Sequence, residues 1–362
     1  ERNKKEMFHR ILVINPGSTS TKVGVYINEQ PLCVSTIRHT VEELMQYEQI
    51  IDQHDFRQQL VIDWLKANDI PFEFDAIIGR GGLIKPIPGG VYRVNRKMVY
   101  ETYYALRKHA CNLGCIIAYE LAKQQQNGCK AYIADPVTVD ELLPEARVSG
   151  SPLMPRLAIW HALNQRAIAR RYASEIGSQY EDLNLIICHL GGGISIAAHQ
   201  KGRAVDANNA LDGEGPLSPE RAGTLPAADL IHLCYSGRYT EDQLKKRVAG
   251  QAGLMAHLGT TDILQIMQQV EAGDAHAKLL IDAMIFHTAK AIAAEGAVFS
   301  GQVDAILITG GMAHSKYITQ GIASRVKFIA PVHLFPGEDE MEALALNALS
   351  VLRGECVAKE YE

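Results

Sequence analysis

The sequence predicts an α/β protein made of two related domains, each with a mixed sheet flanked by helices. The chain of 362 residues is too long for a single ordinary core. Strand-like and helix-like segments alternate along it, and two fragments of the first half recur in the second. We therefore expect a duplicated pair of α/β domains. Paired domains of this kind commonly bind a ligand in the cleft between them.

Two pairs of fragments carry the evidence for duplication. Residues 12–18 are echoed by 186–192, and residues 75–82 are echoed by 304–311. Each fragment is an apolar strand that runs into a glycine-containing turn. Such units are common in α/β proteins and can coincide by chance. Because both pairs occur in the same order, a duplicated domain is the favoured interpretation.

Individual elements follow from apolar runs, helix caps and breakers. The expected strands cover 11–14, 21–26, 75–78, 130–134, a hairpin over 185–199, 303–309 and 332–335. A capping-box pair, Thr40 and Glu43, opens one expected helical region, and Asn95 caps another over 95–109. A further helix ends near Gln126, and one starts at Pro226 and stops before Gly237. The remaining expected helices cover 157–176, 275–297 and 341–352.

Composition and charge argue against several classes of function. Hydrophobic residues make up 47% and charged residues 21%, as in ordinary soluble proteins, and the net charge of -5 disfavours a broad nucleic-acid surface. No apolar run approaches the roughly 18–20 residues of a membrane span, and Ile11–Ile14 is too short for a signal peptide. The seven cysteines, Cys111 and Cys115 included, form no zinc pattern. We expect a cytoplasmic protein with reduced thiols.

A turn rich in hydroxyl groups follows the first apolar strand, where residues 15–22 read NPGSTSTK. Gly17 and the hydroxyls of Ser18 and Ser20 can direct hydrogen bonds at phosphate oxygens, and Lys22 adds a positive charge. The spacing is not that of a Walker loop. Taken alone, the segment is equally compatible with a polar hairpin turn.

A second glycine turn lies in the middle of the chain, where residues 189–195 read HLGGGIS. Gly191, Gly192 and Gly193 would let the backbone approach a ligand closely. An esterase oxyanion loop is the alternative interpretation. The chain contains no G-x-S-x-G nucleophile turn, which argues against that alternative.

A third turn follows a late strand, at Gly310, Gly311 and Met312. A strand that ends in two glycines can pass beneath a nucleoside or a phosphate. The alternative is a tight connection from a strand to a helix, and the segment alone does not decide between them.

Together the three turns resemble the phosphate-1, phosphate-2 and adenosine motifs of the superfamily of acetate and sugar kinases, heat-shock protein 70 and actin. NPGSTSTK is similar to the acetokinase signature N-x-G-S-S/T-S-x-K. Further matching pieces are residues 79–82, 133–136, 189–193 and 218–223. The chain is identified as a member of the acetokinase family, closest to its butyrate kinase branch, over nearly its whole length. The resemblance implies duplicated ribonuclease H-like (actin-like ATPase) domains with ATP in the cleft between them. It implies a first domain of residues 1–150, completed by a C-terminal helix within 341–362, and a second domain of residues 151–340.

The resemblance also implies roles for single residues around the nucleotide. Asn15 corresponds to a family asparagine that lies near the transferred phosphate. The other nucleotide-binding positions are Gly17, Ser18, Ser20, Lys22, His189, Gly191, Gly192, Gly193, Gly310, Gly311 and Met312.

Four residues are implied at the reacting centre. Arg80 corresponds to the family's arginine on the substrate side and Arg221 to a second arginine. Asp135 corresponds to a catalytic aspartate, and His161 to the histidine of an aromatic–histidine pair. Each has an ordinary alternative when taken alone: a surface ion pair for Arg80, a turn residue for Asp135, and a packed helix residue for His161.

The magnesium ligands are implied in two places. One is Asp135, which more plausibly holds the metal or orients groups than removes a proton. The other is an acidic residue just before the last helix, at Glu338, Asp339 or Glu340. Asp339 and Glu340 are favoured, and the sequence does not decide which of the two contacts the metal.

Two departures from acetate kinases agree with the butyrate kinase branch. Gly192 stands where acetate kinases usually carry asparagine. Residues 159–165 read IWHALNQ where they carry G-F-H-G-T-S-H, so Gln165 replaces the second histidine. What takes the place of the asparagine at the phosphates is left open.

The implied activity is transfer of the γ-phosphate of ATP to a short-chain carboxylate, with Mg²⁺ and with ADP as the second product. A carboxylate is already ionised at neutral pH, so no general base is required. Arginine suits the acceptor because its planar fork binds a carboxylate through two hydrogen bonds. Butyrate, a branched analogue, acetate and propionate all remain possible acids, because one methylene contributes only about 1–3 kcal/mol of discrimination.

Two other classes remain as alternatives. A sugar or polyol kinase would use Asp135 as a general base, although two arginines at the centre favour an anionic acceptor. A non-catalytic regulatory module would bind ATP and change shape without turnover. We expect no nucleic-acid or membrane partner, and a homodimer or larger homo-oligomer as in related proteins.

Overall fold

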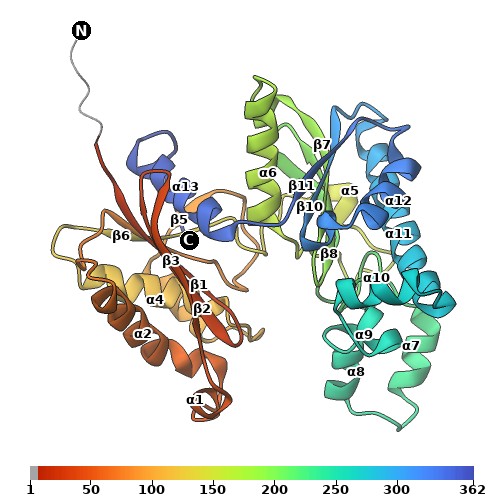
Figure 1. Ribbon diagram of the computed structural model, residues 1–362, viewed down its shortest axis with the longest axis horizontal. Helices are drawn as coiled ribbons and strands as arrows, with labels where there is room; N and C mark the ends of the chain where they lie inside the picture. The colour runs from red at the N-terminus through yellow and green to blue at the C-terminus, as the bar shows by residue number, and fades with distance from the viewer. Residues whose placement is uncertain (1–6) are drawn as a thin grey trace. The chain divides into compact units, whose positions relative to one another are not determined.

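The computed structural model describes residues 7–362, which form two compact units. The first unit comprises the chain up to Val139 together with Asp339–Glu362, and the second is Asp140–Glu338. In both, helices cover the two faces of a mixed sheet (Figure 1). The unit borders lie after 139 and 338 rather than after the expected 150 and 340. Asp140 forms an ion pair inside the second unit, and Asp339 caps a helix of the first.

The first unit is built on a seven-stranded sheet in the order β12-β5-β6-β4-β1-β2-β3. Its strands are β1 (Arg10–Pro16), β2 (Ser20–Ile27), β3 (Gln30–Arg38), β4 (Ala76–Gly79), β5 (Val91–Arg93), β6 (Lys130–Ala134) and β12 (Lys359–Glu360). β1, β2 and β3 form an antiparallel meander, whereas β1, β4 and β6 run parallel. Parallel strands end at one edge of a sheet. That edge therefore carries Asn15, Arg80 and Asp135.

Helices cover both faces of the first sheet. α2 (His54–Ala67) and α4 (Asn112–Lys123) lie on one face and α13 (Glu340–Leu352) on the other (Figure 1). The short helices are α1 (Val41–Leu44), η1 (Ile50–Gln53) and α3 (Arg96–Tyr103). Most of α4 is buried because it packs against both the sheet and α2.

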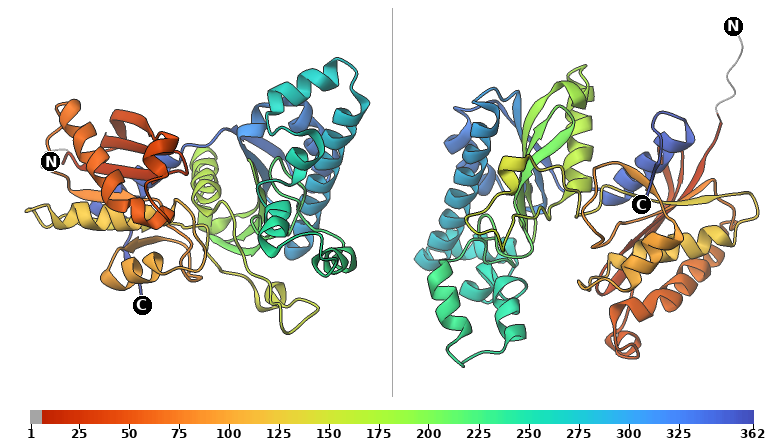
Figure 2. Two further views of the ribbon diagram at one scale, coloured as in Figure 1. Left: turned by 90° about the horizontal axis from the view of Figure 1, so that it is seen from below. Right: turned by 180° about the vertical axis from the view of Figure 1, so that it is seen from behind.

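The second unit contains a five-stranded sheet in the order β11-β10-β7-β8-β9. Its strands are β7 (Asn184–Leu190), β8 (Ile194–Gln200), β9 (Arg203–Ala207), β10 (Ala305–Gly310) and β11 (Val332–Pro336). α6 (Ala162–Glu175) lies on one face, and α11 (Ala275–Glu295) and α12 (Lys316–Val326) lie on the other (Figure 2). The remaining helices are α5 (Pro144–Arg147), η2 (Tyr180–Asp182), α7 (Ala227–Cys234), α8 (Glu241–Val248), α9 (Gly253–Leu258), α10 (Ile263–Glu271), η3 (Gly296–Phe299) and η4 (Gly311–His314).

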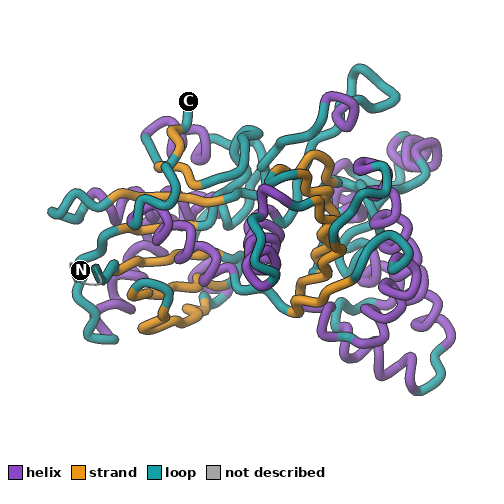
Figure 3. Tube along the Cα trace, turned by 90° about the horizontal axis from the view of Figure 1, so that it is seen from above, coloured by secondary structure: helices purple, strands orange, loops and turns teal. Residues whose placement is uncertain are grey.

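The two sheets share one strand order, which confirms the expected duplication. β3-β2-β1-β4-β6 in the first sheet corresponds to β9-β8-β7-β10-β11 in the second. In each, the first three strands are antiparallel and the others are parallel. Figure 3 shows the strands in orange and the helices in purple. The echoed sequence fragments occupy equivalent strands, β1 with β7 and β4 with β10.

Two expected helices were wrong at one end. The helix expected over 157–176 begins only at Ala162, because the preceding residues are extended: Ile159 forms a β-bridge with Asn209. The helix expected over 95–109 ends at Tyr103. The chain turns after that point so that Cys111 enters the core. Within residues 7–362, none of the helices combines the length and apolar character needed to cross a bilayer.

Candidate active site

A carboxylate joins Asn15 and Arg80 at the sheet edge of the first unit. Glu340 Oε2 accepts a hydrogen bond from Asn15 Nδ2 at 2.7 Å and one from Arg80 Nη1 at 2.6 Å. Asn15 lies near the end of β1, Arg80 follows β4, and Glu340 is the first residue of α13. The side chain of Arg80 is 24% exposed. Its guanidinium is therefore held in a defined position and still borders solvent.

Close backbone packing fixes the turn that carries Arg80. A Cβ atom on Gly79 would lie 2.2 Å from the carbonyl oxygen of Gly114 in α4, so only glycine fits at this crossing. A Cβ atom on Gly81 would lie 2.7 Å from Cβ of Pro136. The turn after β4 thus packs directly against α4 and against the turn after β6.

Asp135 lies in that neighbouring turn after β6. Its backbone has a φ of 39°, which is uncommon for a residue other than glycine. Its Oδ1 accepts a hydrogen bond from Gly90 N at 2.7 Å, and its own N donates to Gly90 O at 3.0 Å. These bonds hold a buried carboxylate beside the Arg80 turn.

The hydroxyl-rich turn is the tight end of the β1–β2 hairpin. Gly17 N donates to Ser20 O at 2.7 Å, and the strand register places Lys22 opposite Asn15. The side chains of Ser18 and Lys22 are exposed. The turn therefore presents polar groups at its surface on a backbone that is fixed by hydrogen bonds.

The three acidic residues at the start of α13 have separate contacts. Asp339 caps the helix, because its Oδ1 accepts a hydrogen bond from Glu342 N at 2.8 Å. Glu338 Oε2 lies 3.0 Å from His189 Nε2 of the second unit. Only Glu340 of the three joins the polar group of the first unit. In the described part of the chain, no group of three or more His, Cys, Asp or Glu side chains is arranged to hold a metal ion.

The glycine turn between β7 and β8 is tied to the loop that carries Arg221. Ser218 Oγ and Glu220 N both donate to Gly192 O, at 2.7 and 3.0 Å. Arg221 N donates to Ser218 Oγ at 3.1 Å, and Arg221 Cγ lies 3.7 Å from the position of a Cβ on Gly193. Two separate sequence motifs therefore meet in one place. Over residues 7–362, the buried Nε of Arg221 has no hydrogen-bond partner.

The third glycine turn lies beside the second. Gly310 has a φ of 93°, and a Cβ atom there would lie 2.4 Å from Leu190 O at the end of β7. Gly310 and Gly337 exchange backbone hydrogen bonds at 2.9 and 3.1 Å. Gly311 opens the short helix η4, in which Met312 is buried. Parallel pairing of β7 with β10 brings the two turns to one edge of the sheet.

Two histidine rings stack at this edge. The centroids of His161 and His189 lie 3.7 Å apart with 7° between the ring planes. Thr309 Oγ1 donates to Gly337 O, so it must accept from Asn164 Nδ2 at 3.1 Å. The same Asn164 nitrogen donates to His189 Nδ1 at 2.9 Å. The proton of His189 is therefore on Nε2, which faces Glu338 at 3.0 Å.

A buried chain of hydrogen bonds fixes the tautomer of His161 as well. Gln165 Nε2 donates to the backbone oxygen of Ser195 at 3.2 Å, which sets the orientation of the amide. Gln165 Nε2 and His161 N both donate to Ser195 Oγ, at 3.0 and 3.2 Å. The hydroxyl of Ser195 is then left to donate to His161 Nδ1 at 2.8 Å. His161 therefore carries its proton on Nε2.

The same chain continues into the core. Gln165 Oε1 accepts from His199 Nε2 at 2.9 Å, and Tyr180 donates to His199 Nδ1 at 2.6 Å. Burial lowers the pKa of His199 to about 3, with Arg166 and Arg170 adding to the effect, so the ring is neutral. Gln165 therefore links Ser195 to the imidazole of His199 in β8.

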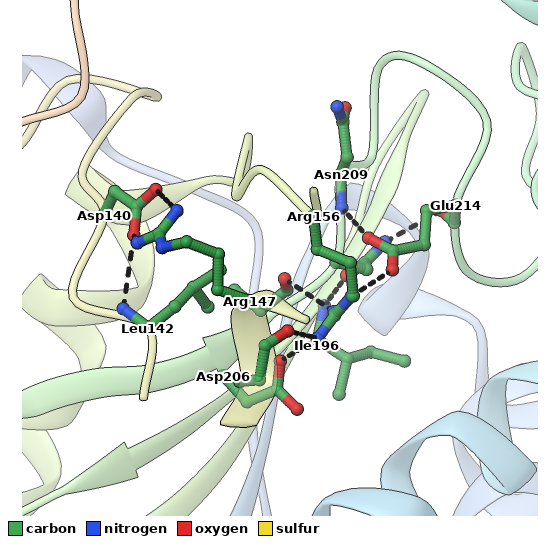
Figure 4. Close-up of polar contacts among 11 residues, drawn as sticks. Asp140, Leu142, Arg147, Arg156, Ile196, Asp206, Asn209 and Glu214 are labelled. Atoms are coloured by element: carbon green, nitrogen blue, oxygen red, sulfur yellow. Dashed lines mark hydrogen bonds and ion pairs between the residues drawn. The ribbon is translucent and has the colours of Figure 1, made fainter. Parts of the chain in front are cut away.

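An arginine held by two acids braces the extended segment before His161 (Figure 4). Arg156 Nε lies 2.6 Å from Glu214 Oε1, and its Nη1 lies 2.9 Å from Asp206 Oδ1. Glu214 Oε2 also accepts from Asn209 N at 2.6 Å. These contacts tie the segment to β9 and to the loop that follows it.

Solved structures with the same fold include an acetate kinase and a propionate kinase. Acetate kinase from Porphyromonas gingivalis superimposes with a TM-score of 0.77 and 16% identity, over 95% of this chain and 100% of that chain. A propionate kinase from Francisella tularensis subsp. tularensis SCHU S4 gives 0.74 and 17%, over 94% and 98%. At these identities the likeness establishes the fold alone.

Sequence comparison shows the family. Residues 158–330 match the model of the acetokinase family. A protein named "Probable butyrate kinase" from Bacteroides thetaiotaomicron is 63% identical over 98% of this chain and 100% of its own length. A protein of the same name from Phocaeicola vulgatus is 50% identical over 97% and 99%. The chain belongs to the acetokinase family, as its motifs predicted.

Proposed function

We propose that this protein transfers the γ-phosphate of ATP to the carboxylate of a short-chain fatty acid, giving an acyl phosphate and ADP in a reversible, direct in-line reaction. The observation that carries the proposal is the group of Asn15, Arg80 and Glu340, which holds a guanidinium at the sheet edge where an anionic acceptor could bind. The 63% identity to a protein named probable butyrate kinase favours butyrate or a branched analogue. Acetate and propionate are the alternative acids.

The residues present suit a nucleotide. Cβ atoms on Gly191 and Gly192 would lie 3.0 and 3.2 Å from side-chain atoms of His189 and Glu220, so a larger residue would crowd this turn, whereas glycine leaves its backbone bare. The buried Nε of Arg221, unpartnered among residues 7–362, is a donor suited to an anion. On this proposal the nucleotide is held by Asn15, Gly17, Ser18, Ser20, Lys22, His189, Gly191, Gly192, Gly193, Gly310, Gly311 and Met312.

Magnesium bound with the nucleotide would offset the negative charge of the phosphate oxygens. Glu340 and Asp135 are the carboxylates placed to orient it. Asp339 is less suited, because its Oδ1 already caps α13.

The protein's own groups would then act by position and charge. Arg80 would bind the acid's carboxylate, which is ionised above a pKa of about 4. Arg221 would stabilise the charge of the migrating phosphoryl group, and His161 could donate a hydrogen bond from Nε2, where its proton is fixed. No side chain has to remove a proton from the acceptor. That distinguishes this site from one that phosphorylates a hydroxyl.

A hydroxamate assay tests the proposal. The protein is incubated with ATP, Mg²⁺, hydroxylamine and straight or branched acids from two to six carbons, and acyl hydroxamate is measured. We expect product, with the largest kcat/KM for a four- or five-carbon acid. Glucose and glycerol serve as controls through ADP release. Failure to form hydroxamate with any acid contradicts the proposal, and ADP release with a polyol alone would identify a hydroxyl kinase.

A further inference from the structure

A buried guanidinium lies behind the β1–β2 turn. Arg57 in α2 is 0% exposed. Its Nη1 donates to Gly17 O at 2.6 Å and to Ser20 O at 3.1 Å, and its Nη2 donates to Ser18 O at 3.3 Å. Gln53 Oε1 accepts two more bonds, from Nε at 3.1 Å and from Nη2 at 2.7 Å. All of these acceptors are neutral, and within residues 7–362 no ion pair involves Arg57.

The absence of a counter-charge is unusual for this chain. Arg156, which is only partly buried, lies between Asp206 and Glu214. The nearly buried Arg166 lies 3.4 Å from Glu141. Because an unpaired buried charge is costly, such arginines normally receive a carboxylate partner.

The groups around Arg57 confirm that it remains charged and uncompensated. Burial lowers its pKa only to about 10, so it is protonated at neutral pH. His39, which contacts Thr21 Oγ1 at 2.9 Å, is neutral: burial first and Arg57 second lower its pKa to about 4. The acidic Glu43 near His39 is engaged in the cap of α1. A full positive charge therefore lies directly behind the turn.

The hydrogen bonds also set the direction of the peptide groups. In a trans peptide the C=O and N–H bonds point in opposite directions. Since Gly17 O and Ser18 O point at Arg57, the N–H groups of Ser18 and Thr19 point away from it. Among the backbone hydrogen bonds of residues 7–362, none uses either of these N–H groups, and both residues are exposed. Adjacent N–H groups of this kind form an anion-binding concavity.

We propose that Arg57 is a positioning residue whose fixed charge is balanced by the phosphate groups of the nucleotide bound at residues 15–22. This inference rests on the proposed function, because it takes those residues as the phosphate site. Arg57 does not touch the ligand. It turns the N–H groups of the turn outward and keeps a positive potential behind them, so the phosphate completes the charge balance of the loop.

The deciding variant is Gln53→Glu. Gln53 is buried and receives a forked pair of bonds from Arg57, which a carboxylate of the same shape would receive equally well. The substitution keeps the hydrogen bonds and cancels the charge. We expect a folded protein with an unchanged or higher melting temperature, and affinities for MgATP and pyrophosphate lowered about tenfold or more, a difference of about 1.4 kcal/mol. A purely structural arginine would leave both affinities unchanged.

The matched control is Gln126→Glu. Gln126 is exposed and precedes β6, at the opposite end of the parallel strands from the turn. The substitution adds the same charge to the same unit, and we expect the parent's affinities for MgATP and pyrophosphate. The measurements are circular dichroism for folding and isothermal titration calorimetry with MgATP and with pyrophosphate.

Arg57→Lys is the converse of Gln53→Glu, because it changes the hydrogen bonds and keeps the positive charge. Lysine loses the fork and keeps the charge, so affinity should stay within about threefold of the parent even if stability falls. The proposal is overturned if Gln53→Glu binds like the parent, or if Arg57→Lys, once folded, loses affinity tenfold. Should Gln53→Glu fail to fold, Arg57→Gln, which removes the charge, takes its place, and the same loss of affinity is expected relative to Arg57→Lys. A parent protein that binds neither ligand would contradict the proposed function instead.

Discussion

The turns that follow β1 and β7 occupy equivalent places in two sheets of the same strand order, yet they rest on different supports. The first is held by the charged Arg57. The second lies beside a chain of neutral groups that runs from Ser195 through Gln165 to His199. In both, a hydroxyl at the start of the second strand, Thr21 or Ser195, contacts a histidine ring. One topology can therefore present either a fixed charge or a set of oriented dipoles.

The difference bears on what each unit can contribute. A buried charge raises the affinity for an anion regardless of its orientation. Oriented neutral donors discriminate by geometry and fix which nitrogen of a histidine carries the proton. The groups that support the two turns thus differ in charge, and the predictions below test what that difference contributes.

The largest expected effect is loss of activity on removing either arginine of the candidate site. Arg80→Ala and Arg221→Ala should each lower kcat/KM for the carboxylate by about 10²–10³, because each removes a cation from the developing charge. Arg80→Ala also leaves Glu340 without its ion pair. The hydroxamate assay measures both. Arg238→Ala, at an exposed arginine, is the control, and losses below about tenfold would exclude a role at the reacting centre.

The next largest expected effect is on the pH dependence of the free energy of unfolding, through the carboxyl group of Glu295. This residue lies near Asp206 and Glu214, the two partners of Arg156 in the second unit. Burial raises its pKa to about 8, with Asp206 and Glu214 adding to the effect. The unfolded chain loses this proton from about pH 4.5, so stability falls as pH rises from there to 8. The expected loss between pH 5 and 8 is about 3 kcal/mol.

Glu295→Gln removes that titration and should flatten the decline. Urea unfolding of parent and variant at the two pH values measures it. Glu271→Gln, at an exposed glutamate of the same unit, is the control. Parallel pH profiles for Glu295→Gln and the parent would show that Glu295 is ionised in the folded protein.

A smaller effect of opposite sign is expected from His199. Its folded pKa of about 3 lies below the unfolded value of 6.5, so stability is present above pH 6.5 and is lost as pH falls. Between pH 7 and 5 this group should remove about 2 kcal/mol. His199→Gln should make the acid side of the profile shallower by that amount. If the free energy of unfolding of His199→Gln kept the parent's slope against pH, the His199 ring would not be held neutral in the folded protein.

The smallest effect concerns thiol reactivity. Cys111 and Cys115 beside the first site are buried, and burial raises their pKa values to about 11 and 12. Cys234 and Cys356 are exposed. Ellman's reagent should therefore react quickly with the exposed pair and slowly with the buried pair until denaturant is added. Fast reaction at Cys111 would show that the sheet edge opens in solution.

Much of the fold could be predicted because its signals are local. Apolar runs and glycine turns located the main strands, and the order of the echoed fragments revealed the duplication. The helix expected from residue 157 failed because Arg156 and the bridge of Ile159 to Asn209 hold that segment extended. Tertiary contacts of this kind leave no periodic signal in the sequence.

The supports of the site were harder to predict than its surface. Arg80, Arg221 and the glycine turns belong to motifs, whereas Arg57 looks like any arginine of an amphipathic helix. Ser195 lay inside the HLGGGIS motif without a role assigned to it. Gln165 was noted only as the position of an absent histidine. Its bond to His199 depends on the register of β8, which folding alone brings into place.

The most direct test of the central claim, phosphoryl transfer to a carboxylate oxygen, uses butyrate labelled with ¹⁸O at both carboxylate oxygens. The protein is incubated with this acid, ATP and Mg²⁺, and the acyl phosphate is analysed by mass spectrometry. Direct transfer predicts that the acyl phosphate retains both labelled oxygens and that ADP carries none. Acyl phosphate that has lost one label, with ¹⁸O in AMP, would show an acyl adenylate route and contradict the account, as would the absence of acyl phosphate.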